Sequence, residues 1–387
     1  MSELVLLVEP GNSGTHGALD RVRAVLADEA SVALIPSGNH QAIVEAIGDD
    51  APLVPSVILT TSGSTGRPRA VELPASALRA SAERAHDRLG GPGVWLTAIP
   101  VTGAGGLNTV VRSLMAGCEP VVWAGVAGAA HFDGAAILPF LQETRQRAKA
   151  LGIRAYTSLV PTQLSRLIGH ARAGNEAAVA ALRELSAFDA VLIGADAIDD
   201  QLRSTLMLYD IPFVSTYGAT ETCGGCVFDG VPLADVDIAF SEDALHRIVV
   251  SGPVVARRYL AEEQSTLSDG RWISNDVGEW RDGKLTVLGR IDDIIKIGGV
   301  TVALTPISVA LGELDGVSDV VVLARPDTEW GQVPIAFVVG AGATDEVLRR
   351  TAAAAVGRNS IPLDIVHLQQ LPLLPNGKPN RQALLEQ

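Results

Sequence analysis

Short apolar runs alternate with helix-like segments between residues 56 and 218. Each apolar run has the length of one strand, and in the segments between them apolar residues recur near every third or fourth position. Because parallel strands need a crossover connection, this alternation predicts parallel βαβ units. Ligands bind such sheets at the carboxyl ends of the strands. The predicted strands are 56–60, 94–99, 120–123, 154–160, 188–195 and 212–218.

The pattern of predicted secondary structure changes twice after residue 218. Residues 226–289 hold short strands separated by Gly and Asp turns, which predicts an antiparallel sheet or a small barrel. Beyond Arg290, apolar runs and two helical segments predict a small α+β unit. Before residue 56 the spacing predicts only a short helical lead-in. We therefore expect an α/β N-terminal domain with βαβ layers and a small antiparallel barrel or sheet over 1–289, and a C-terminal domain over 290–387.

Composition excludes several classes of protein. The net charge of −14 argues against a general nucleic-acid binder, which would present a basic face. No run of eighteen apolar residues suggests a membrane-spanning helix, and the acidic N-terminus lacks the basic start of a signal peptide. The 3 Cys residues cannot form a disulfide framework in a chain of 387 residues. We expect a cytoplasmic protein without stable membrane insertion.

The stretch TTSGSTGRPR, residues 60–69, follows the first predicted strand and precedes a segment that we expect to be helical. Gly63 and Gly66 permit close backbone approach, and backbone N–H groups with Ser and Thr hydroxyls can surround an anion. The pattern is not the GxxxxGK[ST] loop of nucleoside triphosphatases. Taken alone, the stretch is more typical of an ordinary surface loop.

Three distant segments offer matching chemistry. STYGATET (215–222) ends the last predicted parallel strand and brings an aromatic ring, Thr hydroxyls and a carboxylate, which can stack a base, bind a phosphate and hold magnesium. ISNDVGEW (273–280) places Asp276 in a predicted turn, where it can accept two ribose hydroxyls. LPNGKPNR (374–381) is a polar turn that presents Lys378.

With these segments the chain resembles the adenylate-forming superfamily of acyl- and aryl-CoA synthetases, luciferases and peptide-synthetase adenylation domains. TSGSTGRPR is similar to its phosphate loop, YGATE to its nucleotide and magnesium motif, and NDVG to its ribose motif. GRIDDIIKIGG is similar to its hinge and PNGKPNR to its C-terminal lysine loop. The motifs keep the family's order, although the N-terminal part of this chain is shorter than usual.

The resemblance implies a two-step reaction. A carboxylate attacks the α-phosphate of ATP, with Mg2+, to give an acyl-adenylate and pyrophosphate, and the thiol of coenzyme A then displaces AMP. The catalytic residues would be Lys378, Thr220 and Glu221, with Glu221 as the magnesium ligand. Asp292 would be the hinge of a mobile C-terminal domain. The resemblance assigns nucleotide binding to Thr61, Ser62, Gly63, Ser64, Thr65, Gly66, Arg69, Tyr217, Gly218, Asp276 and Arg290.

Three motifs depart from the family pattern. Arg69 stands where the phosphate loop usually ends in Lys, which keeps the charge and alters the geometry. The ribose motif reads SND instead of TGD. In PVTGAGGL (100–107), Gly103 occupies the position where many relatives carry a His beside the acyl site, so we expect no catalytic His there.

Within the superfamily, YTSLVPTQLSRL, TYGATETCGGCVFDG and GPVVARRYL resemble the short actinobacterial o-succinylbenzoate–CoA ligases of menaquinone biosynthesis. That substrate needs room for an aromatic ring and polar groups for a second carboxylate. We expect polar contacts from Thr157 and Ser158, which end a predicted strand. The glycines expected to line the pocket are Gly103, Gly105, Gly106, Gly194, Gly218, Gly224 and Gly225.

Several alternatives stay open at this point. Another aryl- or acyl-CoA ligase would carry the same adenylation motifs, and a non-catalytic nucleotide-binding homologue would explain the altered Lys, ribose and His positions. A self-loading peptide-synthetase module would need a carrier domain after Gln387. Cys223 and Cys226 form a CxxC pair, for which a pocket wall is favoured over a metal or redox site. His86, like the other scattered His residues, is predicted at the surface or in a cap. A homodimer is plausible.

Overall fold

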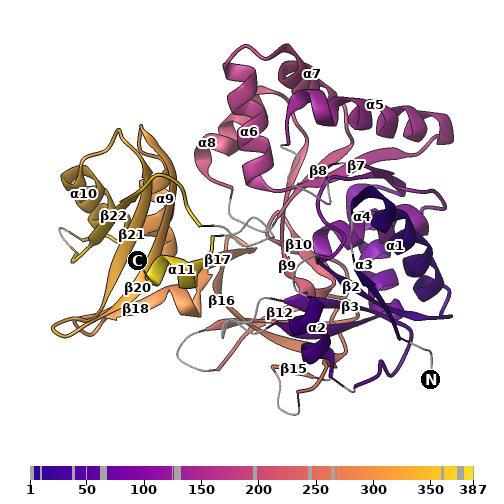
Figure 1. Ribbon diagram of the computed structural model, residues 1–387, viewed down its shortest axis with the longest axis horizontal. Coiled ribbons are helices and arrows are strands. Elements are labelled where there is room, and N and C mark those ends of the chain that lie inside the picture. The colour runs from indigo at the N-terminus through magenta and orange to yellow at the C-terminus, as the bar shows by residue number, and fades with distance from the viewer. Residues whose placement is uncertain are drawn as a thin grey trace. The chain divides into compact units, whose positions relative to one another are not determined.

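The structure is a computed structural model of the 387-residue chain (Figure 1). It forms two compact units. The first unit comprises residues 1–239, 249–273 and 281–285, and the second comprises 240–248, 274–280 and 286–387. The residues that the structure describes are 4–8, 11–36, 40–48, 50–61, 68–123, 125, 132–194, 198–242, 246–262, 266–268, 270–358, 361–372 and 379–386.

A five-stranded sheet in the first unit has the strand order β1-β2-β3-β4-β14. β1, β2 and β3 are parallel, whereas β4 runs antiparallel to both β3 and β14. The strands are β1 (Leu4–Val8), β2 (Ser31–Ile35), β3 (Ser56–Thr61), β4 (Arg69–Pro74) and β14 (Arg258–Tyr259). The helices of this part of the chain are α1 (Gly11–Leu26), α2 (His40–Ile47) and α3 (Ala75–Leu89).

A seven-stranded sheet in the same unit has the order β11-β10-β9-β8-β7-β5-β6, and its β6-to-β9 part is parallel. Figure 1 shows α5 to α8 beside this sheet, and their apolar faces contribute to a large buried core. The strands are β5 (Gly93–Thr97), β6 (Val121–Val122), β7 (Arg154–Leu159), β8 (Ala190–Ile193), β9 (Phe213–Ala219), β10 (Gly224–Phe228) and β11 (Val231–Pro232). The helices are α4 (Ala104–Met115), α5 (Gly134–Leu151), α6 (Pro161–Arg172), α7 (Glu176–Leu185), α8 (Asp200–Leu208) and the 3-10 turn η1 (Thr220–Thr222).

The described residues form two more sheets. One has the order β12-β13-β16-β15, with β17 also paired to β16; its strands are β12 (Asp237–Phe240), β13 (Arg247–Ser251), β15 (Leu267–Ser268), β16 (Arg271–Arg281) and β17 (Lys284–Arg290). The other has the order β19-β18-β21-β20, with β22 parallel to β21. Its elements are η2 (Ile291–Asp293), β18 (Ile294–Ile297), β19 (Val300–Ala303), α9 (Leu304–Gly312), β20 (Val317–Asp327), β21 (Gly331–Gly340), α10 (Asp345–Ala355), β22 (Asp364–Leu368) and α11 (Arg381–Leu385).

The parallel series predicted from the alternating pattern is confirmed for β5 to β9. Two parts of the prediction are wrong. The helical lead-in also contains two parallel strands, β1 and β2. The segment after the loop begins as strand β4, not as a helix, and α3 starts only at Ala75.

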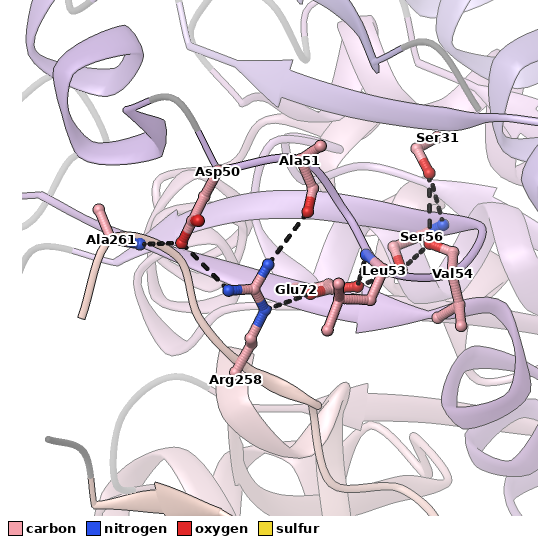
Figure 2. Close-up of polar contacts among 9 residues, drawn as sticks. All are labelled: Ser31, Asp50, Ala51, Leu53, Val54, Ser56, Glu72, Arg258 and Ala261. Carbon is pink, nitrogen blue, oxygen red and sulfur yellow. Dashed lines mark hydrogen bonds and ion pairs between the residues drawn. The ribbon is translucent and has the colours of Figure 1, made fainter. Parts of the chain in front are cut away.

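Strand β4 escaped prediction because its sequence, RAVELP, carries a Glu in the middle of a largely buried strand. Figure 2 shows how that carboxylate is satisfied: Glu72 accepts hydrogen bonds from the backbone N–H of Leu53, the hydroxyl of Ser56 and the guanidinium of Arg258. A buried charge is tolerated when it is paired and hydrogen-bonded in this way. The partner Arg258 lies 186 residues away in the sequence, so no local pattern reveals it.

His86 corrects another expectation. It lies in α3 as predicted but is buried, not at the surface. Burial, with a further effect from Arg112, lowers the pKa of His86 to about 4. Among the helices that the structure describes, none combines the length and the apolar character needed to cross a bilayer.

Candidate active site

Thr220 and Glu221 lie in the sharp turn that joins β9 to β10. The buried hydroxyl of Thr222 holds this turn, because it accepts from the N–H of Ala219 at 2.9 Å and lies 2.8 Å from the carbonyl oxygen of Gly224. The two strands approach closely: a Cβ on Gly218 would lie 2.0 Å from that same carbonyl oxygen. The glycine in YGATE is therefore required by packing, and the turn presents Thr220 and Glu221 in a fixed geometry.

Glu221 is buried, with 7% of its surface exposed, and both its side chain and its backbone are hydrogen-bonded. Its side-chain Oε1 accepts a hydrogen bond of 2.8 Å from the hydroxyl of Tyr259. Its backbone carbonyl accepts a 2.8 Å hydrogen bond from the N–H of Ala256. The segment that leads into β14 thus fixes both the main chain and the carboxylate of the predicted magnesium ligand.

Arg69, the first residue of β4, packs against the ring of Tyr259. Its guanidinium carbon is 3.4 Å from the centroid of that ring, a close cation–π contact. Two of its nitrogens donate to the two carboxylate oxygens of Glu262 at 2.6 and 2.5 Å. The hydrogen bond to Glu262 is the main cause of a raised pKa for Arg69, which keeps the guanidinium charged. Desolvation, followed by the charge of Glu221, raises the pKa of Tyr259, which keeps the phenol protonated.

The predicted phosphate loop connects two antiparallel strands. Thr61 ends β3 and is the register partner of Arg69 at the start of β4. The loop is therefore a hairpin connection whose two flanking residues are described, whereas Ser62, Gly63, Ser64, Thr65 and Gly66 lie outside the described residues. Through Arg69 and Tyr259, the base of this hairpin is linked to Glu221 of the β9–β10 turn.

In the second unit, Asp276 and Arg290 form a pair. The Nη1 of Arg290 lies 3.3 Å from Oδ1 of Asp276, whose side chain is 16% exposed. Asp276 was predicted to lie in a turn, and this is wrong: it lies within the long strand β16. The hydroxyl of Ser274 accepts from the N–H of Asp276 and approaches its carbonyl oxygen, which fixes the backbone at the SND motif.

The two polar residues predicted to contact the acid lie near the end of β7. Thr157 is fully buried, and its hydroxyl donates to the carbonyl oxygen of Leu96 at 3.1 Å. Ser158 follows it in the same strand and is also buried. The hydroxyl of Thr157 thus already has a partner in the neighbouring strand β5.

Two glycines predicted to line the pocket differ in the room around them. Gly194 follows β8, and a Cβ there would lie 2.6 Å from the hydroxyl oxygen of Thr216. Gly103 caps the start of α4, and a Cβ there would lie 3.6 Å from the carbonyl oxygen of Pro100, an ordinary contact distance. Position 103 therefore has room for a Cβ, whereas a Cβ at position 194 would clash with the Thr216 side chain.

The CxxC segment begins at Cys223, just before β10, and its other three residues are the first three of that strand. Gly224 has φ +88°, and a Cβ there would lie 2.2 Å from Nδ2 of Asn108, whose amide donates to the carbonyl of Cys223. Gly225 is partly buried beside Thr216. Burial raises the pKa of both thiols, for Cys226 to about 12, so neither Cys223 nor Cys226 is a ready thiolate.

Lys378 lies outside the described residues, and of Asp292 only the backbone, within η2, is described. Tyr217 is half-buried in β9. The structure also reveals residues that the sequence did not single out, namely Tyr259, Glu262, Asp293 and Arg381. Arg258 and Tyr259 stand in GPVVARRYL, where an aromatic residue next to two cations was the available signal.

The fold and these motifs define the class of the protein: the chain belongs to the AMP-binding enzyme family. The family model matches residues 23–260, and that of the AMP-binding enzyme C-terminal domain matches 307–378. The predicted resemblance to adenylate-forming enzymes is confirmed.

Individual relatives are more specific. A probable 2-succinylbenzoate–CoA ligase of Mycobacterium tuberculosis (strain ATCC 25618 / H37Rv) is 38% identical over 394 residues, which cover 97% of this chain and 96% of that protein. A 2-succinylbenzoate–CoA ligase of Listeria monocytogenes is 28% identical over 348 residues, or 85% of this chain and 69% of that protein.

Among solved structures, the o-succinylbenzoate CoA synthetase (MenE) of Bacillus subtilis in complex with the acyl-adenylate intermediate OSB-AMP has a TM-score of 0.79 with this chain. The match covers 99% of this chain and 88% of that one at 20% sequence identity. At this identity the likeness concerns the fold, and it confirms the predicted adenylate-forming architecture.

Proposed function

We propose that this chain is an ATP-dependent acid–CoA ligase that converts o-succinylbenzoate to o-succinylbenzoyl-CoA through an acyl-adenylate, in menaquinone biosynthesis. The observation that carries the proposal is the 38% identity to a probable 2-succinylbenzoate–CoA ligase over nearly the full length of both proteins. The fixed β9–β10 turn with Thr220 and Glu221 supports it, because it offers a hydroxyl and a carboxylate at the carboxyl end of a parallel strand.

The adenylation step brings two anions together, the substrate carboxylate and the α-phosphate of ATP. Preorganised donors and positive charge must offset their repulsion. In this chain, Thr220 would donate to the α-phosphate, and the hydroxyls and N–H groups of residues 61–66 would hold the β- and γ-phosphates. Lys378 would bridge the α-phosphate and the substrate carboxylate. Asp276, oriented by Arg290, would accept hydrogen bonds from the ribose hydroxyls.

The donor set around Glu221 fits a magnesium ion bound with a nucleotide. Magnesium in such sites is held by one or two carboxylates and by phosphate oxygens, and it keeps several waters. Glu221 supplies one buried carboxylate whose Oε1 is oriented by Tyr259. When bound, the ion would neutralise phosphate charge during adenylation.

The second step needs the C-terminal part of the chain to move. We infer a domain boundary at 289/290, with Asp292 as the hinge, so that residues 290–387 first deliver Lys378 and then withdraw it to admit coenzyme A. One small domain would then serve both half-reactions.

The proposal is tested by ATP–pyrophosphate exchange across a panel of carboxylic acids, followed by detection of the thioester after addition of coenzyme A. We expect exchange with o-succinylbenzoate and formation of its CoA thioester. Exchange with benzoates or fatty acids alone would refute the proposed substrate. Absence of exchange with every acid would refute the ligase activity and favour a non-catalytic nucleotide-binding protein.

A second candidate is a ligase for another aryl acid. An indoleacetate–CoA ligase of Aromatoleum aromaticum is 28% identical over 420 residues, or 97% of this chain and 77% of that protein. Indoleacetate therefore belongs in the acid panel, where a preference for it over o-succinylbenzoate would establish this alternative.

We further propose that the protein acts in the cytoplasm, with small molecules rather than nucleic acid as its partners, and that it forms a homodimer. The net charge of −14 supports the choice of partners, because it disfavours binding to a phosphate backbone. Light scattering on the purified protein measures the oligomeric state directly.

A further inference from the structure

Strand β14 consists of two residues, Arg258 and Tyr259, whose side chains make different contacts. Successive side chains of a strand point to opposite faces, so Arg258 and Tyr259 lie on different sides of β14. Arg258 pairs in register with Glu72 of β4, and Tyr259 pairs with Val71. One side chain can therefore anchor the strand while the next reaches the β9–β10 turn.

Arg258 provides the anchor. Figure 2 shows its guanidinium between Glu72, the carboxylate of Asp50 and the carbonyl of Ala51, at distances of 2.9, 3.0 and 3.0 Å. Asp50 also accepts from the N–H of Ala261, just beyond β14. Glu72 is fully buried, so this arrangement ties β14 to the interior of the five-stranded sheet. The position of Tyr259 is fixed by these bonds as well as by its own packing.

The hydroxyl of Tyr259 has one proton, and its hydrogen-bond partner determines where that proton points. An ionised carboxylate oxygen can only accept a hydrogen bond. The hydroxyl therefore donates its proton to Oε1 of Glu221, at 2.8 Å. The Tyr259 residue is 1% exposed, so water does not compete for this bond.

Arg69 holds the ring of Tyr259 from one face. The guanidinium stacks at 3.4 Å and is kept there by two hydrogen bonds to Glu262, which lies three residues beyond Tyr259. The nitrogens that make these bonds are Nε and Nη2 of Arg69. The Arg that replaces the family's Lys is therefore part of a clamp on Tyr259.

We propose that Tyr259 is a positioning residue for Glu221: its hydroxyl, fixed by Arg258 through β14 and by Arg69 over the ring, orients the Glu221 carboxylate for a nucleotide-bound divalent cation. This inference rests on the proposed function only for the identity of Glu221 as a cation ligand. Hydrogen-bond partners behind metal ligands commonly change metal affinity by about 10- to 100-fold when removed.

The test is Tyr259→Phe, which removes one oxygen and keeps the ring that Arg69 covers. Binding of Mn2+, as a magnetic probe for Mg2+, is measured by electron paramagnetic resonance with the protein and a non-hydrolysable ATP analogue, without acid or coenzyme A. We expect the apparent dissociation constant for Mn2+ to rise about tenfold. Affinity for the metal-free nucleotide should change less than about twofold.

Two controls separate positioning from general damage. Tyr156→Phe removes the hydroxyl of another buried Tyr, whose hydrogen-bond partners are the carbonyls of Leu89 and Gly91 and not Glu221. It should leave Mn2+ affinity unchanged. In a Glu221→Gln background, Tyr259→Phe should have no further effect on Mn2+ affinity, because coupled residues are not additive.

Unchanged Mn2+ affinity in Tyr259→Phe would overturn the proposal, as would an equal loss in Tyr156→Phe or a full tenfold loss in the Glu221→Gln background. The measurement needs no turnover. If no acid supports pyrophosphate exchange, the proposed function fails while the metal titration still decides the role of Tyr259.

Discussion

Arg381 donates hydrogen bonds to both carboxylate oxygens of Asp293, at 2.6 and 3.0 Å. Asp293 ends η2, immediately after the β17 strand, and Arg381 begins α11 near the end of the chain. An acidic pair such as Asp292–Asp293 is expected to lie in solvent, yet the Asp293 side chain is only 9% exposed. The bidentate pair therefore joins the predicted hinge region to the C-terminal helix within the second unit.

Arg381→Ala should destabilise the second unit by about 1–3 kcal/mol, because it leaves a buried carboxylate without its charged donor. Arg381→Lys should recover only part of this loss, since Lys cannot make the two parallel bonds. Urea unfolding measures both. If the double variant Asp293→Asn with Arg381→Gln is as unstable as Arg381→Ala, the ion pair is not the cause.

Lys378 precedes Arg381 by three residues in the sequence. Lys378→Ala should reduce acid-dependent pyrophosphate exchange by roughly two or more orders of magnitude, the loss seen when one transition-state donor is removed. Thioester formation from supplied acyl-adenylate should survive, because Lys378 is proposed to act only in adenylation. Lys284→Ala, at an exposed position in β17, is the matched control and should retain both steps. Equal loss of both steps in Lys378→Ala would contradict the two-conformation scheme.

Much of the fold could be predicted from local patterns. The parallel strands β5 to β9 follow from short buried runs alternating with helices, because each unit of that pattern is local in the sequence. Strand β4 could not be predicted in this way. Its charged residue Glu72 is compensated by Arg258, and a contact across 186 residues leaves no periodic trace.

The candidate site also contains some residues that local sequence patterns reveal and others that only the structure reveals. The motif containing Thr220 and Glu221 was recognisable from residue types at the end of a predicted strand. The clamp of Arg69, Tyr259 and Glu262 was not, because its members act through geometry and not through a spacing motif. Arg69 was predicted to bind phosphate, and that role stays a prediction. Its described contacts are with Glu262 and Tyr259.

Gly218→Ala should disrupt nucleotide binding. A Cβ at this position would lie 2.0 Å from the backbone carbonyl oxygen of Gly224, so the β9–β10 turn must shift. We expect ATP affinity to fall about tenfold or more and stability to fall by about 1–3 kcal/mol, as for other overpacked sites. Gly169→Ala in α6, with nothing within 4 Å of the added carbon, should instead be neutral or stabilising by up to about 1 kcal/mol. Calorimetric titration with ATP and thermal unfolding of both variants test the contrast.

His86 should make the protein sensitive to mild acid. Its pKa is about 4 in the folded protein, because of burial and the neighbouring Arg112, and 6.5 in the reference state. Above pH 6.5 the residue is mostly neutral in both states and contributes little pH dependence. As the pH falls from 6.5 towards 4, the unfolded chain binds the proton first, so folded stability decreases.

Proton linkage at His86 therefore lowers the free energy of unfolding by about 2 kcal/mol between about pH 7.5 and pH 5. His86→Leu should remove this part of the decrease, whatever other groups contribute, whereas His170→Leu at an exposed position of α6 should keep it. Urea unfolding of the three proteins at about pH 7.5, 6 and 5 provides the comparison. Parallel stability profiles for wild type and His86→Leu would show that His86 is protonated inside the fold and that its burial does not depress its pKa.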